Sequence, residues 1–257
     1  MIDYMKELTP EQKAKWIKIF SENDVKTASA MYAIRSVAQH FVETENLIEA
    51  DAQNEVQKNL PTWTPSNDNE IGEFMFERDQ ARQLHDETLI PMQRYSCIVM
   101  LFIVIERELR HLMANLKIHG RLTNVAIDPR GGFLEKTKQA LDKCYGLKVG
   151  DCPHYGALRD LQMIRDCIIH CQGEVALSRD IEDLIKLNDK LDGFLAYPMS
   201  DIKLEPLCIK HFITEMMEFF IWVFKQLQQL QPVAKLNWKI NPSDELQKLE
   251  QIIKRVE

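Results

Sequence analysis

The chain has 257 residues, enough for one large domain or two, and its hydrophobic content of 45% is ample for a buried core. It contains only nine Gly and ten Pro, most of them between long stretches with a polar and apolar period, which favours an all-α protein. The formal net charge of −7 argues against a generally basic surface that stores or packages nucleic acid. Any contact with RNA therefore has to come from a local patch.

Neither a signal peptide nor a membrane span is evident in the sequence. The first residues lack the apolar core of a secretory signal. The longest apolar run, 97–105, has nine residues, and the run 212–224 is interrupted by Glu215 and Glu218, whereas a spanning helix needs about 20 residues. Six Cys at irregular spacing indicate buried free thiols in a reducing compartment. We therefore expect a soluble, cytoplasmic protein without a membrane partner.

Helical signals fill the first 60 residues. Thr9, Pro10 and Glu11 read as an N-cap, a first helical residue and an acidic first turn, so a helix begins near Pro10. Residues 21–24 offer a break and a new cap before a second, amphipathic helix that runs to about Asn59. The polar stretch 60–69 carries two Pro and predicts a loop. We interpret 1–60 as an N-terminal helical appendage to the rest of the chain.

A further helix is expected over 71–85, and Pro91 then begins or kinks a helix that continues to about Lys117. Apolar residues of this second helix predict one buried stripe that contains an acid: Val99, Phe102, Ile103, Glu106, Leu109 and Met113. A buried carboxylate needs a partner. Glu106 has two candidates, Arg165 on another helix and Arg110 four residues further along its own helix.

The elements after residue 120 complete a helical bundle over 70–231. Residues 128–132 form a turn; their Gly pair lacks the Lys-Ser/Thr ending of a phosphate-binding loop. Helices are expected over 133–146 and 205–231, with 178–191 as a helix or charged turn between them and 195–198 extended. Residues 232–257 form a tail with a short amphipathic helix, which can dock on the bundle or on a second subunit.

The stretch 158–175 carries the residues with the clearest chemistry. Its apolar residues recur at steps of three and four and predict a buried stripe: Leu158, Leu161, Ile164 and Ile168. Asp166 and His170 are four apart and lie nearly one above the other, whereas Arg165 is five from His170 and offset from it. The helix should end near Gly173, so His170 falls in the last turn, where the helix dipole favours a protonated imidazole.

The run from Arg165 and Asp166 through Cys167, Ile168 and Ile169 to His170 resembles the signature of the HEPN superfamily. The order of the helices around it, which covers about 95–230, resembles the large members of that family. The resemblance implies an all-α, HEPN-like helical bundle with additional N-terminal helices. It also implies a homodimer, because family members bring two Arg-His pairs together in one cleft, and a metal-independent ribonuclease of the toxin-antitoxin, phage-defence or CRISPR type.

If the resemblance holds, the substrate is RNA and no cofactor or metal takes part. His170 would act as general base or acid, Arg165 would stabilise the charged transition state, and Asp166 would orient His170. Glu106 would support Arg165. The expected products carry 2′,3′-cyclic phosphate and 5′-hydroxyl ends. An antitoxin or another protein partner is also expected for an enzyme of this type.

Two other interpretations remain open. Asp166 stands where the family most often has Asn, and it could hold Arg165 in a salt bridge. The chain would then be a non-catalytic scaffold that binds a protein or a nucleotide. Alternatively, thiols and imidazoles could assemble a zinc site, although the chain has no C-x-x-C pair. The residues considered for zinc are Cys144, Asp151, Cys152, His154, Cys167, His170 and Cys171.

Overall fold

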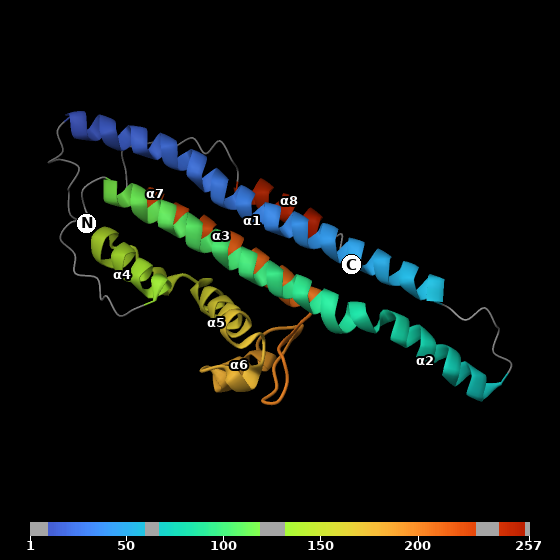
Figure 1. Cartoon of the computed structure of the whole chain (residues 1–257). Helices are drawn as coiled ribbons and strands as arrows, with labels where there is room; N and C mark the ends of the chain where they lie inside the picture. Colours follow the sequence, from blue (N-terminus) through green and yellow to red (C-terminus); the bar gives the residue numbers. More distant parts are fainter. Residues whose placement is uncertain (1–9, 60–66, 119–131, 230–241, 255–257) are drawn as a thin grey trace. The chain divides into compact units, whose positions relative to one another are not determined.

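The computed structural model describes residues 10–59, 67–118, 132–229 and 242–254. This part of the chain contains eight α-helices, four helical turns of three or five residues and one two-stranded hairpin (Figure 1). The prediction of an all-α bundle is therefore confirmed at the level of fold class. The described part of the chain adds to it this hairpin and an isolated antiparallel β-bridge between Glu174 and Asp201.

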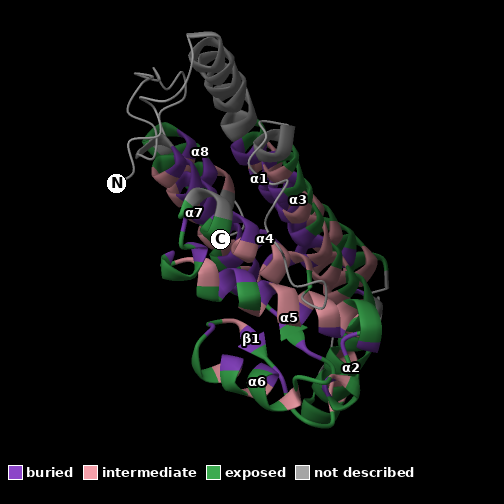
Figure 2. Ribbon diagram, turned by 90° about the vertical axis from the view of Figure 1, so that its left-hand side faces the viewer, coloured by how far each residue is buried: buried purple, intermediate pink, exposed green. Residues whose placement is uncertain are grey.

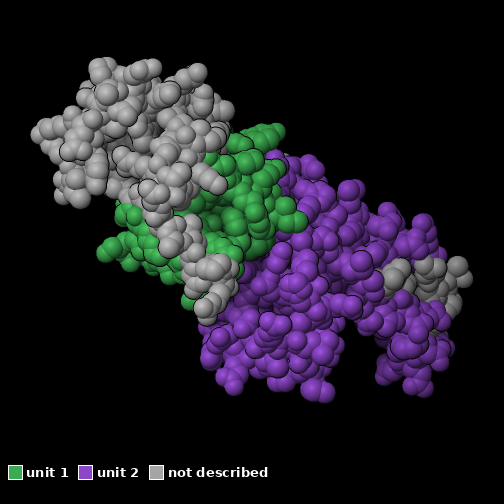
Figure 3. All heavy atoms as spheres, turned by 60° about the vertical axis from the view of Figure 1, so that its left-hand side comes forward, with its two compact units in different colours: residues 1–35, 101–160, 212–249 green, residues 36–100, 161–211, 250–257 purple. Residues whose placement is uncertain are grey.

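Two compact units divide the chain, and each is assembled from segments that are far apart in the sequence (Figure 3). Unit 1 comprises Met1–Arg35, Leu101–Asp160 and Phe212–Leu249. Unit 2 comprises Ser36–Met100, Leu161–His211 and Glu250–Glu257. Long helices therefore contribute one part to each unit. The expected division into an appendage, a bundle and a tail stays a prediction.

Helix α1, Pro10–Asn59, is continuous over 50 residues. It begins at Pro10 as predicted, but the expected break at 21–24 is wrong. Those four residues include neither Pro nor Gly, so nothing in them prevents helical backbone angles, and a potential capping side chain does not by itself end a helix. Most of the expected loop at 60–69 lies outside the described residues; Asn67 caps the next helix.

Helix α2, Asp68–Leu84, leads without a loop into a π-helical turn, His85–Leu89, and then into α3, Ile90–Ile118. Pro91 is the second residue of α3, where it has no N–H to donate. The wider π turn immediately before it gives the proline ring room within a continuous helix. The first residue of that turn, His85, is buried, and its Nε2 lies 3.2 Å from an Asp51 carboxylate oxygen on α1.

The buried face of α3 differs from the predicted stripe. Leu109 and Phe102 are buried as expected, but Ile103 is exposed and Val99 is only partly buried. The observed core face is turned by about one residue and includes Cys97, Ile98, Leu101, Phe102, Ile105, Glu108, Leu109 and Leu112. Because α3 is apolar on nearly every side around 97–105, periodicity alone could not decide which side packs inward.

Unit 1 contains α4, Phe133–Tyr145, most of α7, Pro206–Gln229, and most of α8, Pro242–Ile253. The Met and Phe stripe predicted for α7 is core, since all five of its residues are buried: Phe212, Met216, Phe219, Phe220 and Val223. Helix α8 docks within this unit. Its buried Glu245 accepts a 2.6 Å hydrogen bond from Arg35 of α1. This contact is with α1, which the sequence assigned to the N-terminal appendage and not to the bundle.

Unit 2 contains the larger part of α5, Tyr155–Cys171, with α6, Ile181–Lys186, and the hairpin of β1, Phe194–Leu195, with β2, Lys203–Leu204. The strands are antiparallel, and Phe194 is opposite Leu204. The side-chain amide of Asn188 donates to and accepts from the backbone of Ala196 at 2.8 and 2.7 Å. Buried and exposed residues alternate through this region (Figure 2).

One described helical segment, His85–Ala114, is long and apolar enough to cross a membrane by length and composition. Only 28% of its most apolar 18 residues is buried within the protein. The apolar core helix of a soluble protein passes the same test. The expectation of a cytoplasmic, membrane-free protein therefore stays a prediction.

Candidate functional site

The predicted motif lies on α5, a helix of 17 residues that ends at Cys171. Leu158, Leu161 and Ile164 are buried as expected, but Ile168 is only partly buried. The buried face continues instead through Cys167 and Cys171, at the next steps of three and four. This face leaves Arg165 and Asp166 at intermediate exposure and His170 exposed.

Arg165 and Asp166 form an ion pair with each other. Arg165 Nη1 donates to Asp166 Oδ1 at 2.6 Å, and 25% and 36% of the two side chains remain exposed. Within the described part of the chain, Asp166 is thus paired with the arginine and not with His170. This is the arrangement in which the carboxylate neutralises the guanidinium, the second of the two roles that the sequence left open for Asp166.

His170 lies in the last turn of α5, as predicted, and its side chain is exposed; the helix ends one residue after it. Gln172 adopts a left-handed conformation with φ of 56°, and the Gly173 N–H donates to the Cys167 carbonyl at 3.2 Å. This bond joins residues six apart, one more than in the 6→1 bond of a Schellman motif. Gln172 is the first left-handed residue after the helix, so it takes the C′ position, one before the Gly173 that the sequence suggested.

Two features exclude a side chain at position 173: the left-handed backbone of Gly173 and the nearby side chain of Tyr95. The φ of Gly173 is 91°, and a Cβ at this position would lie 2.5 Å from the hydroxyl oxygen of Tyr95 on α3. That hydroxyl donates to the Ile202 carbonyl at 2.6 Å, and the Ile202 N–H donates in turn to the Gly173 carbonyl at 2.9 Å. The segment after His170 is thus fixed between α3 and the strand around Ile202.

Glu106 pairs with Arg110, the local one of its two candidate partners. Its side chain is partly exposed, whereas the neighbouring Glu108 is the acid of α3 that is buried, with 4% of its side chain exposed. Glu108 accepts a 2.8 Å contact from Arg107 and lies 3.8 Å from His111 Nδ1. The rotated core face of α3 explains why Glu108 rather than Glu106 is buried.

The cysteines are structural thiols. Five of the six are free and buried, as predicted: Cys97, Cys152, Cys167, Cys171 and Cys208. Burial raises the pKa of Cys97, Cys167 and Cys208 to about 12 and that of Cys152 to about 11. Such thiols carry little thiolate at neutral pH and are poor nucleophiles.

The histidine and cysteine side chains considered for zinc do not converge. Among the residues that the structure describes, no three His, Cys, Asp or Glu side chains are grouped closely enough to hold a metal ion. His154 instead places its Nδ1 2.9 Å from Glu215 Oε2 on α7. The side chain of Cys144 lies outside the described ones.

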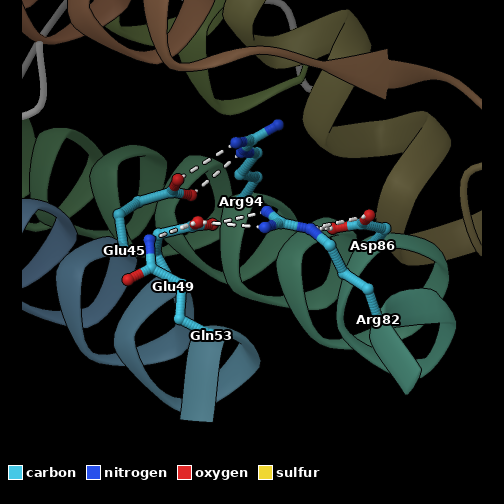
Figure 4. Close-up of polar contacts among 6 residues, drawn as sticks. All are labelled: Glu45, Glu49, Gln53, Arg82, Asp86 and Arg94. Atoms are coloured by element: carbon cyan, nitrogen blue, oxygen red, sulfur yellow. Dashed lines mark hydrogen bonds and ion pairs between the residues drawn. The ribbon is translucent and has the colours of Figure 1, made fainter. Parts of the chain in front are cut away.

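A second set of charged residues, unnoticed in the sequence, joins α1, α2 and α3 in unit 2 (Figure 4). Arg94 binds both carboxylate oxygens of Glu45, at 2.9 and 3.0 Å, and also donates to the Leu204 carbonyl at 2.9 Å. Arg82 binds both oxygens of Glu49, at 3.0 and 2.6 Å. We refer to these four charged residues as the ion-pair cluster.

The chemistry of the ion-pair cluster is structural. Arg94 and Glu45 are mostly buried, with 18% and 10% of their side chains exposed, and their pairing is bidentate. Arg82 also bonds Asp86, and its hydrogen bond to Glu49 lowers the pKa of that carboxyl. Each guanidinium in the cluster is bonded to a carboxylate, so neither is free to receive a phosphate group.

Sequence reasoning missed Tyr95 and Arg94, although both bind the segment Ile202–Leu204, which supports the end of α5. Tyr95 bonds the Ile202 carbonyl, and Arg94 bonds that of Leu204. The only signal in the sequence was a pair of polar side chains just before the apolar run 97–105. Such a pair indicates a partner for each side chain but does not identify it.

No protein-family model matches this chain, and the searches of curated proteins and of solved structures found no match.

Proposed function

We propose that this protein cleaves RNA without a metal ion, using Arg165 and His170 at the end of α5. The observation that supports the proposal most is the exposed imidazole of His170, with the guanidinium of Arg165 five residues before it on the same helix. A general base or acid has to reach solvent to meet a polymeric substrate. The resemblance of the run from Arg165 to His170 to the HEPN signature supports the same reaction.

The reaction requires a base, an acid and a positive charge. A base removes the proton of a ribose 2′-hydroxyl, the 2′-oxygen attacks the adjacent phosphorus, and the 5′-oxygen leaves with a proton from an acid. The products are a 2′,3′-cyclic phosphate and a 5′-hydroxyl. One imidazole cannot serve at both ends of an in-line displacement, so the site would combine the His170 side chains of two subunits, with Arg165 near the phosphate oxygens.

Cleavage of a mixed RNA in excess EDTA tests this function. Wild-type protein should cut, whereas His170→Ala, which removes a general acid–base group, and Arg165→Ala, which removes a charge that stabilises the transition state, should each reduce the rate by about 100-fold or more. Arg179→Ala and His40→Ala are matched controls, because both residues are exposed on other elements. Cleavage that requires a divalent ion, or that survives both site substitutions, would exclude the proposed site.

A non-catalytic scaffold is the second candidate, and the 2.6 Å ion pair between Arg165 and Asp166 favours it. An arginine already neutralised by a carboxylate has less affinity for a phosphate. Since a partly exposed ion pair is worth at most about 1 kcal/mol, Asp166→Asn should speed cleavage by no more than about fivefold in an active enzyme. Absence of cleavage in both wild type and Asp166→Asn would favour the scaffold.

A further inference from the structure

Helix α2 leaves most of its large apolar side chains exposed to solvent. Its start is capped by Asn67, whose side chain accepts from the Glu70 N–H at 3.0 Å, and its end is held to α1 by Arg82. None of its described side chains is buried, although the helix carries several large apolar residues (Figure 2). The exposed fractions are 48% for Ile71, 40% for Met75 and 63% for Phe76.

These apolar residues share one side of the helix. With a turn of about 100° per residue, Ile71, Gly72, Met75 and Phe76 fall within an arc of about 140°. We call these four residues the α2 face. Neighbouring apolar side chains left in solvent usually mark a contact with another molecule, whereas single ones need no explanation.

Gly72 is the most informative member of the α2 face. Glycine weakens a helix at an interior position, so its presence there needs a reason. No atom of the described chain lies within 4 Å of the position that a Cβ would take at Gly72. Packing against the described residues therefore does not require a glycine, whereas close approach of another backbone would.

Charge selects the kind of molecule that fits. Residues 68–84 contain five carboxylates and two arginines, a net charge of −3. Arg82 is bound to Glu49 and Arg78 to Asp79, so both cations are already neutralised. A second copy of this chain would bring the same negative charge, and nucleic acids or anionic membranes would likewise be repelled. The complementary partner is positively charged.

We propose that the α2 face binds a basic amphipathic helix of another protein. Apolar side chains of that helix would cover Ile71, Met75 and Phe76, and its backbone would approach at Gly72. Its Lys and Arg residues would lie near Asp68 and Glu73. Helices of this kind bind apolar surfaces through residues spaced three and four apart. The inference does not depend on ribonuclease activity.

Binding of labelled synthetic helices to the full chain tests the proposal by fluorescence anisotropy. The probe is an 18-residue amphipathic Leu/Lys peptide, and a Leu/Glu peptide of the same pattern is its control. The Leu/Lys peptide should bind, and Ile71→Ser with Phe76→Ser should weaken binding at least tenfold. Leu177→Ser with Met199→Ser is the matched control, since both residues are exposed apolar residues on other elements, and it should bind as wild type does.

Gly72→Leu gives the sharper test, because leucine strengthens the helix and so does not unfold it. This variant should weaken binding of the Leu/Lys peptide at least tenfold while its urea midpoint stays the same or rises. Equal binding of the two peptides, or full binding by Gly72→Leu, would overturn the proposal.

Three further results would also overturn it. A clear loss of stability in the Ile71→Ser, Phe76→Ser variant would mean that the chain itself covers the α2 face. A dimer that depends on Phe76 in sedimentation would make the occupant a second copy. Phe76-dependent binding to phosphatidylcholine vesicles would make it a membrane.

Discussion

The ion-pair cluster and the end of α5 both place arginines beside carboxylates in unit 2, but they are built in opposite ways. Arg94 and Glu45 are 49 residues apart and mostly buried, with two hydrogen bonds between them. Arg165 and Asp166 are adjacent in the sequence, more exposed, and joined by one hydrogen bond of 2.6 Å. The first pair holds helices together, whereas the second leaves its charges near solvent.

The difference shows that a recognisable sequence motif and a well-supported charged cluster need not coincide. The motif at Arg165 could be read from the sequence because its residues are consecutive. The cluster at Arg94 could not, since its partners come from α1 and from β2. Yet Arg94 bonds β2 at Leu204 and Tyr95 bonds Ile202 just before β2, and Ile202 in turn bonds Gly173 just after the motif. The segment that follows His170 is thus held in place by hydrogen bonds that begin at Arg94 and Tyr95 of α3.

Removing Arg94 should have the largest effect on stability. Arg94→Met leaves the Glu45 carboxylate buried without its bidentate partner, which costs about 3–5 kcal/mol when a buried pair is broken. Arg165→Met should cost less than about 1 kcal/mol, because that pair is partly exposed. Urea unfolding followed by circular dichroism measures both. Similar losses of unfolding free energy in Arg94→Met and Arg165→Met would contradict the proposed difference between the two ion pairs.

A double substitution sharpens the same test. Glu45→Gln in the Arg94→Met background removes the buried, unpaired carboxylate of Glu45, so part of the lost stability should return. An additive loss would mean that Arg94 acts mainly through its bond to the Leu204 carbonyl.

Gly173→Ala should have the next largest effect. Its left-handed φ of 91° and the Tyr95 hydroxyl oxygen, 2.5 Å from the position of a Cβ, both oppose a side chain. Residues forced into such a conformation cost about 1–3 kcal/mol each. Repeating the substitution in a Tyr95→Ala background, again by urea unfolding, separates backbone strain from overlap. If the cost does not fall there, overlap with Tyr95 is not part of it.

Tyr95→Phe should have a smaller effect, because it removes one hydrogen bond and keeps the ring. Loss of the bond to the Ile202 carbonyl should cost about 1 kcal/mol, and somewhat more if the carbonyl is left buried and unsatisfied. Amide hydrogen exchange should also quicken at Ile202, whose N–H binds Gly173. Unchanged exchange would show that Tyr95 does not support the segment after His170.

The smallest expected effect is the pH dependence that Glu49 contributes. Its pKa is lowered from 4.5, mainly by the hydrogen bond from Arg82. A depressed folded pKa gives stability that is present above the unfolded pKa and is lost as pH falls through the folded value. The gap in urea midpoint between wild type and Glu49→Gln should shrink from pH 7 to pH 3. Solvent keeps this contribution below about 1 kcal/mol.

Local periodicity predicted most of the helices, including the core stripe of α7 and the first part of the buried face of α5. Apolar residues three and four apart share one side of a helix whichever elements pack against it. It failed where local signals were ambiguous. At 21–24 a capping pattern did not end α1, and in α3 an apolar surface on every side left the core face undecided. Of the candidate site, the sequence predicted the position of His170 in the last turn of α5 and left two partners open for Asp166, of which the structure shows Arg165.

The sequence by itself determined the helical fold class, the burial of five thiols and the position of His170 in a last helical turn, because these depend on composition and on residues a few positions apart. Only the tertiary structure decided that Glu108 is the buried acid of α3, that Arg94 pairs with Glu45 and that Tyr95 lies against Gly173. Those facts depend on which helix faces turn toward each other. Many packings satisfy the same helical period, so the period alone cannot select one.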